Sequence, residues 1–213
     1  NTTNHEEAIK EFEAAIAMNE NLADLYVSLG ISYRLTMQAD RAVETFLRAI
    51  ALRPDDAEPY AELAATYFNA GEYAKGIQYA EEAVKRKPED PFLQGLLGTL
   101  YFRNLQYTEA IPYLRLAMRG GFTAEGVQVQ PMAVDRQNAA SVAYLSRFGI
   151  ALANVGQCGE ALQVAQELVQ KVPGDENAAY NAQVMIDTCR EFAENPPTPE
   201  AGSEPAATET PVP

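Results

Sequence analysis

The chain has 213 residues, of which 47% are hydrophobic, so it is long enough to bury a sizeable core. Its 16 lysines and arginines are outnumbered by 30 aspartates and glutamates, and the net charge of −14 argues against nucleic acid and anionic membrane surfaces as partners. No run of about 18 apolar residues is present, so we expect no direct insertion of this segment into a membrane.

Apolar residues recur at helical spacing through the first 119 residues. Tyr26, Leu29 and Tyr33, for example, fall on one face of a helix. Pro54 follows the next helix and ends it, because proline lacks an amide donor and clashes with the preceding turn. The pattern predicts helices at 4–19, 23–36, 39–52, 57–70, 73–86, 91–104 and 107–119.

The helical pattern breaks at Gly120 and gives way to an irregular insertion, 125–141. Within it, residues 127–130 alternate with a period of two and predict a short extended segment that ends at Pro131. Two interpretations stay open. The insertion is either a spacer between helical units, or a functional arm that covers a groove or pairs with a partner's strand.

A weaker helical pattern resumes after the insertion. Leu145 and Phe148 open it, and Ala161 and Leu168 continue it on a second helix. A last amphipathic helix follows. The remainder of the chain is rich in Pro, Glu, Thr and Ala and has no apolar period, so it is expected to be disordered.

The pattern also repeats itself. The interval from Tyr33 to Pro54 recurs between Tyr67 and Pro88, an offset of 34 residues, which indicates stacked units. The aligned residues are Tyr26, Leu29, Gly30, Tyr33, Ala42, Phe46, Ala49 and Pro54, then Tyr60, Leu63, Ala64, Tyr67, Gly76, Ala80, Ala83 and Pro88, and in a third copy Gln94, Leu97, Gly98, Tyr101, Ala110, Leu114 and Ala117.

This order of large, small and aromatic residues resembles the tetratricopeptide repeat (TPR) family. The resemblance implies an all-α fold, a right-handed α-solenoid of stacked helix-turn-helix repeats with a C-terminal capping helix. We accordingly expect six segments. They are the second helix of a truncated repeat (1–22), three repeats (23–124), the insertion (125–141), a fourth, divergent repeat (142–175), the capping helix (176–194) and the disordered tail (195–213).

Catalysis finds little support in the residues. The only histidine, His5, has no nucleophile partner that spacing identifies, and adjacent carboxylates such as Glu81 and Glu82 do not share a helix face. There is no phosphate-binding loop, dinucleotide fingerprint or serine elbow. Two cysteines and one histidine make a poor zinc site. We therefore expect no enzyme activity, no cofactor and no bound metal.

The two cysteines, Cys158 and Cys189, fall at the start of one late helix and near the end of the next. In the stacking of the TPR family these helices are antiparallel neighbours, so the two ends are expected to lie side by side. Either a disulfide joins them or both remain buried thiols. A disulfide favours a location outside the cytoplasm, whereas free thiols favour the cytoplasm.

In TPR stacks the first helix of each unit lines the concave surface, where ligands bind. Members that clamp terminal carboxylates use Lys, Asn and Arg there, and this chain departs from that pattern with apolar residues such as Val27, Phe92 and Leu96. The alternative for Phe68 and Phe102 is that they pack between neighbouring first helices. The expected partner-binding groove consists of Val27, Ile31, Arg34, Leu35, Ala65, Phe68, Asn69, Thr99, Phe102 and Arg103.

These expectations point to a non-catalytic protein–protein interaction scaffold. Its partner would be another protein, which presents a peptide or an amphipathic helix to the groove. The scaffold would serve as an accessory or assembly subunit of a larger complex. The alternative is a structural subunit that forms homo-oligomers through exposed ends of the solenoid.

Overall fold

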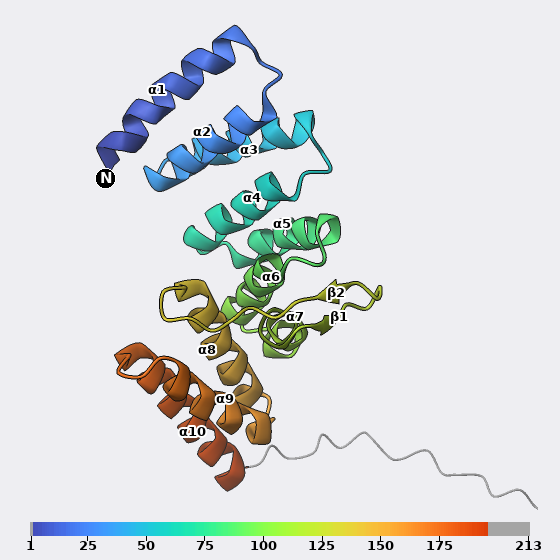
Figure 1. Cartoon of the computed structure of the whole chain (residues 1–213), viewed down its shortest axis with the longest axis vertical. Coiled ribbons are helices and arrows are strands. Elements are labelled where there is room, and N and C mark those ends of the chain that lie inside the picture. The colour runs from blue at the N-terminus through green and yellow to red at the C-terminus, as the bar shows by residue number, and fades with distance from the viewer. Residues whose placement is uncertain (1, 196–213) are drawn as a thin grey trace, which may run out of the picture.

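A computed structural model describes residues 2–195 of the chain. Within that part, ten helices and one two-stranded sheet follow in sequence (Figure 1). The helices are α1 (Thr2–Met18), α2 (Ala23–Leu35), α3 (Ala39–Leu52), α4 (Ala57–Asn69), α5 (Tyr73–Arg86), α6 (Pro91–Arg103), α7 (Tyr107–Arg119), α8 (Ala139–Asn154), α9 (Cys158–Lys171) and α10 (Glu176–Glu194). The strands are β1 (Gly121–Phe122) and β2 (Gln128–Val129).

The seven helices predicted up to residue 119 are all present, with bounds that differ by two residues at most. Aspartates at equivalent places help to fix the starts of two of them. Asp56 accepts a hydrogen bond from the backbone N–H of Glu58 (3.1 Å), and Asp90 accepts one from Phe92 (2.9 Å). Each cap satisfies an amide that the first helical turn leaves without a partner. Of the tail predicted at 195–213, all but Asn195 lies outside the described residues.

The helices pack as successive antiparallel pairs, each pair on the next (Figure 1). Small residues allow the close approach within a pair. A Cβ added to Gly30 would lie 2.5 Å from the ring of Phe46, and one added to Gly98 would lie 2.6 Å from Leu114. Such contacts are too short for any side chain, so glycine permits the helix spacing. The all-α repeat array predicted from the sequence is therefore confirmed.

The apolar core follows the stack from one end to the other instead of forming a single centre. Phe46 lies in the part of the core between the first pairs, Leu97 in the middle part and Phe148 in the last part, and each is at most 1% exposed. Because neighbouring pairs share these clusters, each pair stabilises the next. Among the described residues, no helix is both long and apolar enough to cross a bilayer.

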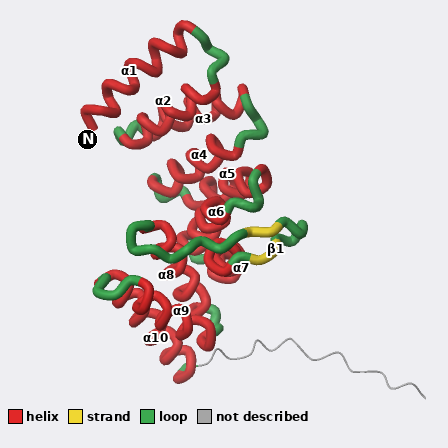
Figure 2. Tube along the Cα trace, in the orientation of Figure 1, coloured by secondary structure: helices red, strands yellow, loops and turns green. Residues whose placement is uncertain are grey.

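Residues 121–129, which overlap the start of the predicted insertion (125–141), form a small hairpin beside α7 (Figure 2). Strand β2 lies within the segment predicted to be extended, and it pairs antiparallel with β1, which the sequence pattern did not reveal. The base of the hairpin is anchored, because Val129 is 1% exposed and the backbone N–H of Met132 donates to the carbonyl of Ala117 at 2.8 Å. The hairpin therefore has a fixed base against α7 and a tip, residues 123–127, that joins the two strands.

The stack continues past the insertion. Two arginines of α7 form two-pronged ion pairs with α9: Arg115 with Glu160, at 2.6 and 2.8 Å, and Arg119 with Glu167, at 3.1 and 2.6 Å. Helix α8 packs against both α7 and α9, and α10 packs against α8 and α9. The insertion thus loops out of the connection between two units without displacing the later pair.

Candidate functional site

The first helices of the units, α2, α4, α6 and α8, lie next to one another along the stack. We call their accessible or partly accessible side chains the inner face. It consists of Ile31, Leu35, Ala65, Phe68, Asn69, Phe92, Phe102, Arg103 and Arg147. This surface contains most of the groove residues expected from the sequence.

Two of the expected groove residues are not accessible. Val27 and Thr99 are each 4% exposed, so their side chains lie beneath the surface and do not offer contact area. Leu35 is 44% exposed, and Asn69 and Arg103 are also exposed. The other expected residues have intermediate exposure.

The two phenylalanines expected in the groove have one side packed and another accessible. Phe68 lies 5.9 Å from the ring of Tyr73, and Phe102 lies 5.4 Å from the ring of Tyr107, measured between ring centroids. Each pair joins a first helix to the second helix of the same unit. Part of each ring therefore packs against the second helix of its own unit and not between neighbouring first helices, while the remaining part belongs to the inner face.

Arg34 was expected among the groove residues, and the structure shows its charge engaged by Glu62 of the next first helix. Nη2 of Arg34 lies 2.8 Å from Glu62 Oε2, and Nε donates to the same oxygen at 3.0 Å. Both side chains are about four-fifths buried. This ion pair links α2 to α4 and leaves little free charge at that level of the inner face.

Arg103 has no such carboxylate partner among the described residues. Its guanidinium donates to the hydroxyl of Tyr73 at 2.6 Å and lies over two rings, 5.2 Å from the centre of Tyr73 and 5.8 Å from that of Phe68. These contacts hold the side chain in place without neutralising it. Its charge therefore remains available.

Arg147 on α8 is a functional candidate that the sequence analysis missed. Burial lowers the pKa of its guanidinium from the usual value, and the positive charge of Arg103 acts in the same direction. The described residues supply no ion pair to it. The repeat alignment can be continued beyond the insertion by matching Leu145 to Gln94. Arg147 then matches Leu96 and Glu62 of the earlier units, so this alignment would have placed it on the same helix face.

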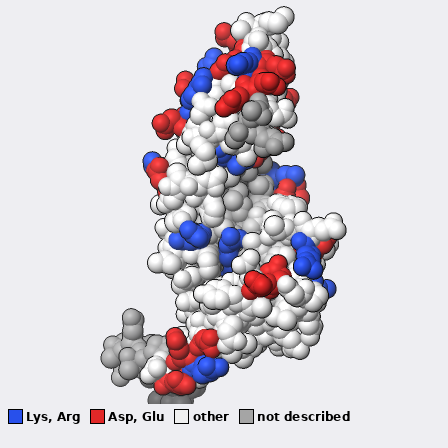
Figure 3. All heavy atoms as spheres, turned by 90° about the vertical axis from the view of Figure 1, so that its left-hand side faces the viewer, with Lys and Arg blue, Asp and Glu red and all other residues white. Residues whose placement is uncertain are grey.

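Charge is unevenly spread over the surface. On the side drawn in Figure 3, acidic side chains gather mostly toward the top, and some basic side chains in the middle stand apart from them in a largely uncharged area. An acidic protein with an uncharged surface along part of its length can accept an apolar segment there without placing charges opposite it.

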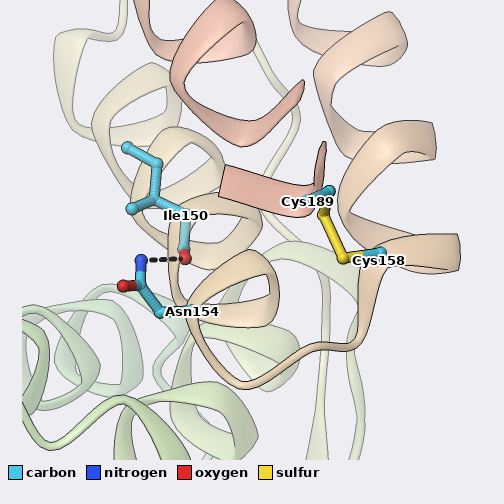
Figure 4. The surroundings of a disulfide bond; sticks show 4 residues. All are labelled: Ile150, Asn154, Cys158 and Cys189. Carbon is cyan, nitrogen blue, oxygen red and sulfur yellow. Dashed lines mark hydrogen bonds between the residues drawn. A yellow bond between two sulfur atoms is a disulfide. The ribbon is translucent and has the colours of Figure 1, made fainter. Parts of the chain in front are cut away.

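Cys158 and Cys189 lie where the resemblance placed them, on the antiparallel helices α9 and α10. Their Cα atoms are 5.5 Å apart and the sulfur atoms are at disulfide distance (Figure 4). The end of α8 lies beside them, and there the side-chain amide of Asn154 donates to the carbonyl of Ile150 at 2.8 Å. This arrangement connects the last two helices of the stack.

A separate hollow lies on the other side of α6, between α5, α7 and the hairpin, with a volume of about 590 Å³. Gln94 contributes to its wall and is 1% exposed. Its amide N–H donates to the carbonyl of Pro88 at 2.8 Å, and its buried side-chain oxygen accepts no hydrogen bond from the described residues. One signal in the sequence marks this position, since Gln94 stands where the other units have Tyr26 and Tyr60.

Two tyrosine hydroxyls with raised pKa values form hydrogen bonds between neighbouring units. Burial and a hydrogen bond to Glu13 raise the pKa of Tyr33 to about 12, and burial and a bond to Glu81 (2.5 Å) raise the pKa of Tyr101. These phenols stay protonated at neutral pH, so they do not act as bases or nucleophiles there. No group of three or more metal-ligating side chains occurs in the part of the chain that the structure describes.

Comparisons with known proteins agree with this geometry. Family models described as tetratricopeptide repeat match residues 2–57 and 45–78. The crystal structure of YrrB, described as a TPR protein with an unusual peptide-binding site, is 26% identical, with a TM-score of 0.66 over 85% of this chain and 86% of that one. No curated protein matches the chain.

Two further solved structures show the same fold at lower identity. A tetratricopeptide repeat protein from Parabacteroides merdae is 14% identical and has a TM-score of 0.66, covering 90% of this chain and 70% of that one. MamA from Desulfovibrio magneticus RS-1 is 17% identical and has a TM-score of 0.64, covering 81% of this chain and 88% of that one.

Proposed function

Because the chain belongs to the tetratricopeptide repeat family, whose members mediate protein–protein interactions and are usually non-catalytic, we propose that it is a docking scaffold for another protein. The partner presents a peptide or an amphipathic helix, which lies along the inner face. In this role the chain is an accessory or assembly subunit of a larger complex.

One observation carries the proposal, namely a row of accessible apolar side chains across three successive first helices. Leu35 on α2 is 44% exposed, and Phe68 on α4 and Phe102 on α6, which also lie near the C-terminal ends of their helices, are partly exposed. When an apolar face of a partner helix or peptide covers such side chains, the complex is stabilised by about 25 cal/mol for each Å² of apolar surface removed from water. The similarity to YrrB, a TPR protein with a peptide-binding site, supports the same role.

The proposal is tested with peptides selected from a random library against the full chain. Leu35→Ser removes an accessible leucine of the inner face. Leu47→Ser is a matched control, because Leu47 is 43% exposed but lies on α3, a second helix. We expect Leu35→Ser to weaken binding of the selected peptides about tenfold, the effect of roughly 1.4 kcal/mol, and Leu47→Ser to leave it unchanged. Equal affinities for both variants and the unchanged protein would reject the inner face as the docking surface.

Self-assembly is the second candidate, and one observation favours it. The last helix of the stack, α10, exposes Tyr180 (70%) opposite its buried residues and Ile186 (37%) at the edge of the buried face. A second copy that packs on α10 would bury both residues. Light scattering over a hundredfold range of protein concentration distinguishes the candidates. A dimer that Tyr180→Ser converts to a monomer supports self-assembly, and a monomer at every concentration rejects it.

A further inference from the structure

The hollow between α5, α6, α7 and the hairpin, which we call the hairpin hollow, has an occupied counterpart in the preceding unit. There, Arg86 at the end of α5 covers Tyr60 of α4. The guanidinium lies 3.8 Å from the centre of the ring, and Nη2 donates to the tyrosine hydroxyl at 2.7 Å. Nε of the same arginine donates to the carbonyl of Pro54 at 2.6 Å. A ring and a guanidinium are thus packed together beside the loop that precedes α4.

The next unit lacks both of these side chains. At the offset of 34 residues, Tyr60 corresponds to Gln94 and Arg86 corresponds to Gly120. Gln94 keeps one contact of the tyrosine. Its Nε2 donates to the carbonyl of Pro88 at 2.8 Å, just as the hydroxyl of Tyr60 donates to the proline before α4 at 3.2 Å. Neither the ring nor the guanidinium is replaced at these positions, and the hollow of about 590 Å³ lies beside Gln94.

One atom shows which group is missing. The oxygen of Tyr60 accepts a hydrogen bond from Arg86, whereas the buried side-chain oxygen of Gln94 accepts none from the described residues. A buried acceptor without a donor lowers stability. Residue 120 cannot carry an arginine of its own, because a Cβ added to Gly120 would lie 2.8 Å from the carbonyl oxygen of Val129. A guanidinium in this place therefore has to come from another molecule.

The wall of the hairpin hollow carries more negative than positive charge. Glu81 of α5 and Glu125 of the hairpin tip both line it, together with the ring of Tyr113. Glu81 is held in place by the hydroxyl of Tyr101, which donates to it at 2.5 Å. Among the described residues that line the hollow, Lys85 is the one cation. Two carboxylates beside an aromatic ring are suited to a cation with a flat face.

The rest of the wall is mainly apolar, with Val84, Leu97 and Leu116 among its residues. An arginine side chain combines an apolar stem with a planar guanidinium, so it can cover such a wall and still reach the carboxylates. A lysine has the stem, but its ammonium lacks the planar fork that lies over a ring and donates to two acceptors at once. The hollow therefore favours arginine over lysine.

We propose that the hairpin hollow binds an arginine side chain of a partner protein, with the stem against the apolar wall and the guanidinium between Glu81 and Glu125. The hollow lies on the other side of α6 from the inner face, so this site is distinct from the proposed docking surface. Residues 196–213 contain no lysine or arginine, so they cannot supply the occupant. The net charge of −14 favours the approach of a segment that carries a cation.

The experiment uses a capped arginine, N-acetyl-arginine amide, as the probe and follows its binding to the full chain by NMR. The comparison probes are the capped forms of citrulline, which has nearly the same shape without the charge, and of lysine. We expect the arginine probe to bind saturably at about millimolar concentration and at least about tenfold more tightly than the citrulline probe. Its binding should shift the amide signals of Gln94 and of residues 123–125.

Variants of the protein locate the site. Gln94→Tyr restores the residue of the other units and should weaken the arginine probe at least about tenfold by filling the hollow. Glu125→Gln removes a carboxylate at an exposed tip, so the fold is kept, and it should weaken the probe about threefold. Glu89→Gln is the matched control, because Glu89 is exposed and lies outside the lining. It measures the effect of net charge alone and should leave the affinity unchanged. Lys85→Gln should strengthen binding, since it removes the cation of the wall.

Three results would overturn the proposal. They are no saturable binding up to about 10 mM, equal affinity for the citrulline probe, and an effect of Glu125→Gln no larger than that of Glu89→Gln. A lysine probe that binds more tightly would reject the guanidinium. If Gln94→Tyr converts a dimer into a monomer in light scattering, the arginine belongs to a second copy, which overturns the assignment to a partner protein. Leu35→Ser should not affect the arginine probe, so failure of this site leaves the inner face as the docking surface.

Discussion

Gly71 and Leu105 occupy equivalent positions in successive units and have the same left-handed backbone conformation, with φ of 77° and 62°. Each follows a first helix, and the next residue closes the turn. The backbone N–H of Glu72 donates to the carbonyl of Tyr67, and that of Gln106 donates to Tyr101, both at 2.9 Å. This pattern is the Schellman motif, in which glycine is the favoured residue at the left-handed position.

Leu105→Gly should therefore stabilise the protein, although it removes a large apolar side chain. Leu105 is 72% exposed, so little burial is lost, and glycine avoids the steric cost of the left-handed conformation. We expect a gain of about 0.5–1 kcal/mol in the free energy of unfolding, measured by urea denaturation.

Gly71→Ala is the reciprocal change. A Cβ at residue 71 has no neighbour within 4 Å, so any effect comes from backbone strain and not from a clash. A loss of about 1 kcal/mol is expected. If Leu105→Gly destabilises the protein while Gly71→Ala is neutral, the left-handed conformation does not limit stability at these two turns.

The cysteine pair predicts that the stability of the last two helices, α9 and α10, depends on whether the cysteines are oxidised. Cys158 and Cys189 are separated by 31 residues, and closing a loop of that length with a disulfide stabilises the folded state by about 3–4 kcal/mol. Unreduced protein should therefore show no thiol that reacts with an alkylating agent in intact mass spectrometry. Reductant should accelerate hydrogen exchange in α9 and α10.

The control for this prediction is the double variant Cys158→Ser and Cys189→Ser, whose stability should not respond to reductant. Two alkylated cysteines in unreduced protein would show that the pair consists of free thiols. A disulfide would favour a location outside the cytoplasm, since reducing compartments do not maintain such bonds.

Tyr33 predicts a loss of stability at alkaline pH. Burial and the bond to Glu13 raise the pKa of Tyr33 to about 12 in the folded protein, whereas an unfolded tyrosine titrates near about 10. Between these values the unfolded state releases the proton first, so the free energy of unfolding falls as pH rises. In Tyr33→Phe, the free energy of unfolding measured by urea denaturation should fall less between pH 9 and 12 than in the unchanged protein. If it falls equally in both proteins, Tyr33 is not the source of the pH dependence.

The structure of the hairpin predicts that a substitution at its base lowers the stability of the protein more than one at its tip. Val129 at the base is 1% exposed, so Val129→Ala should lower the free energy of unfolding by about 1–2 kcal/mol. Glu125→Ala at the exposed tip should change it by less than about 0.5 kcal/mol. If the tip variant costs as much as the base variant, the tip is part of the packed stack.

The sequence predicted the helices well because the residues that form them repeat. Leu29, Leu63 and Leu97 recur at one interval, and a pattern carried by three copies identifies both the helices and their stacking. The two cysteines could be placed side by side for a related reason, since the antiparallel order of α9 and α10 follows from the stack.

Contacts between units were harder to predict, because they join residues that no local pattern relates. Arg34 meets Glu62 across 28 positions of sequence, and periodicity gives the helix face of each residue but not its partner. Arg147 was missed because the insertion interrupts the register. Strand β1 consists of Gly121 and Phe122 alone, too short to show an alternating pattern.

Hydrogen exchange of the full chain, with and without a saturating selected peptide, tests the central claim most directly. Binding along the inner face predicts slower exchange in α2, α4, α6 and α8, and little change in α3, α5 and α7. Protection confined to the second helices or to the outer side of α10 would contradict the account.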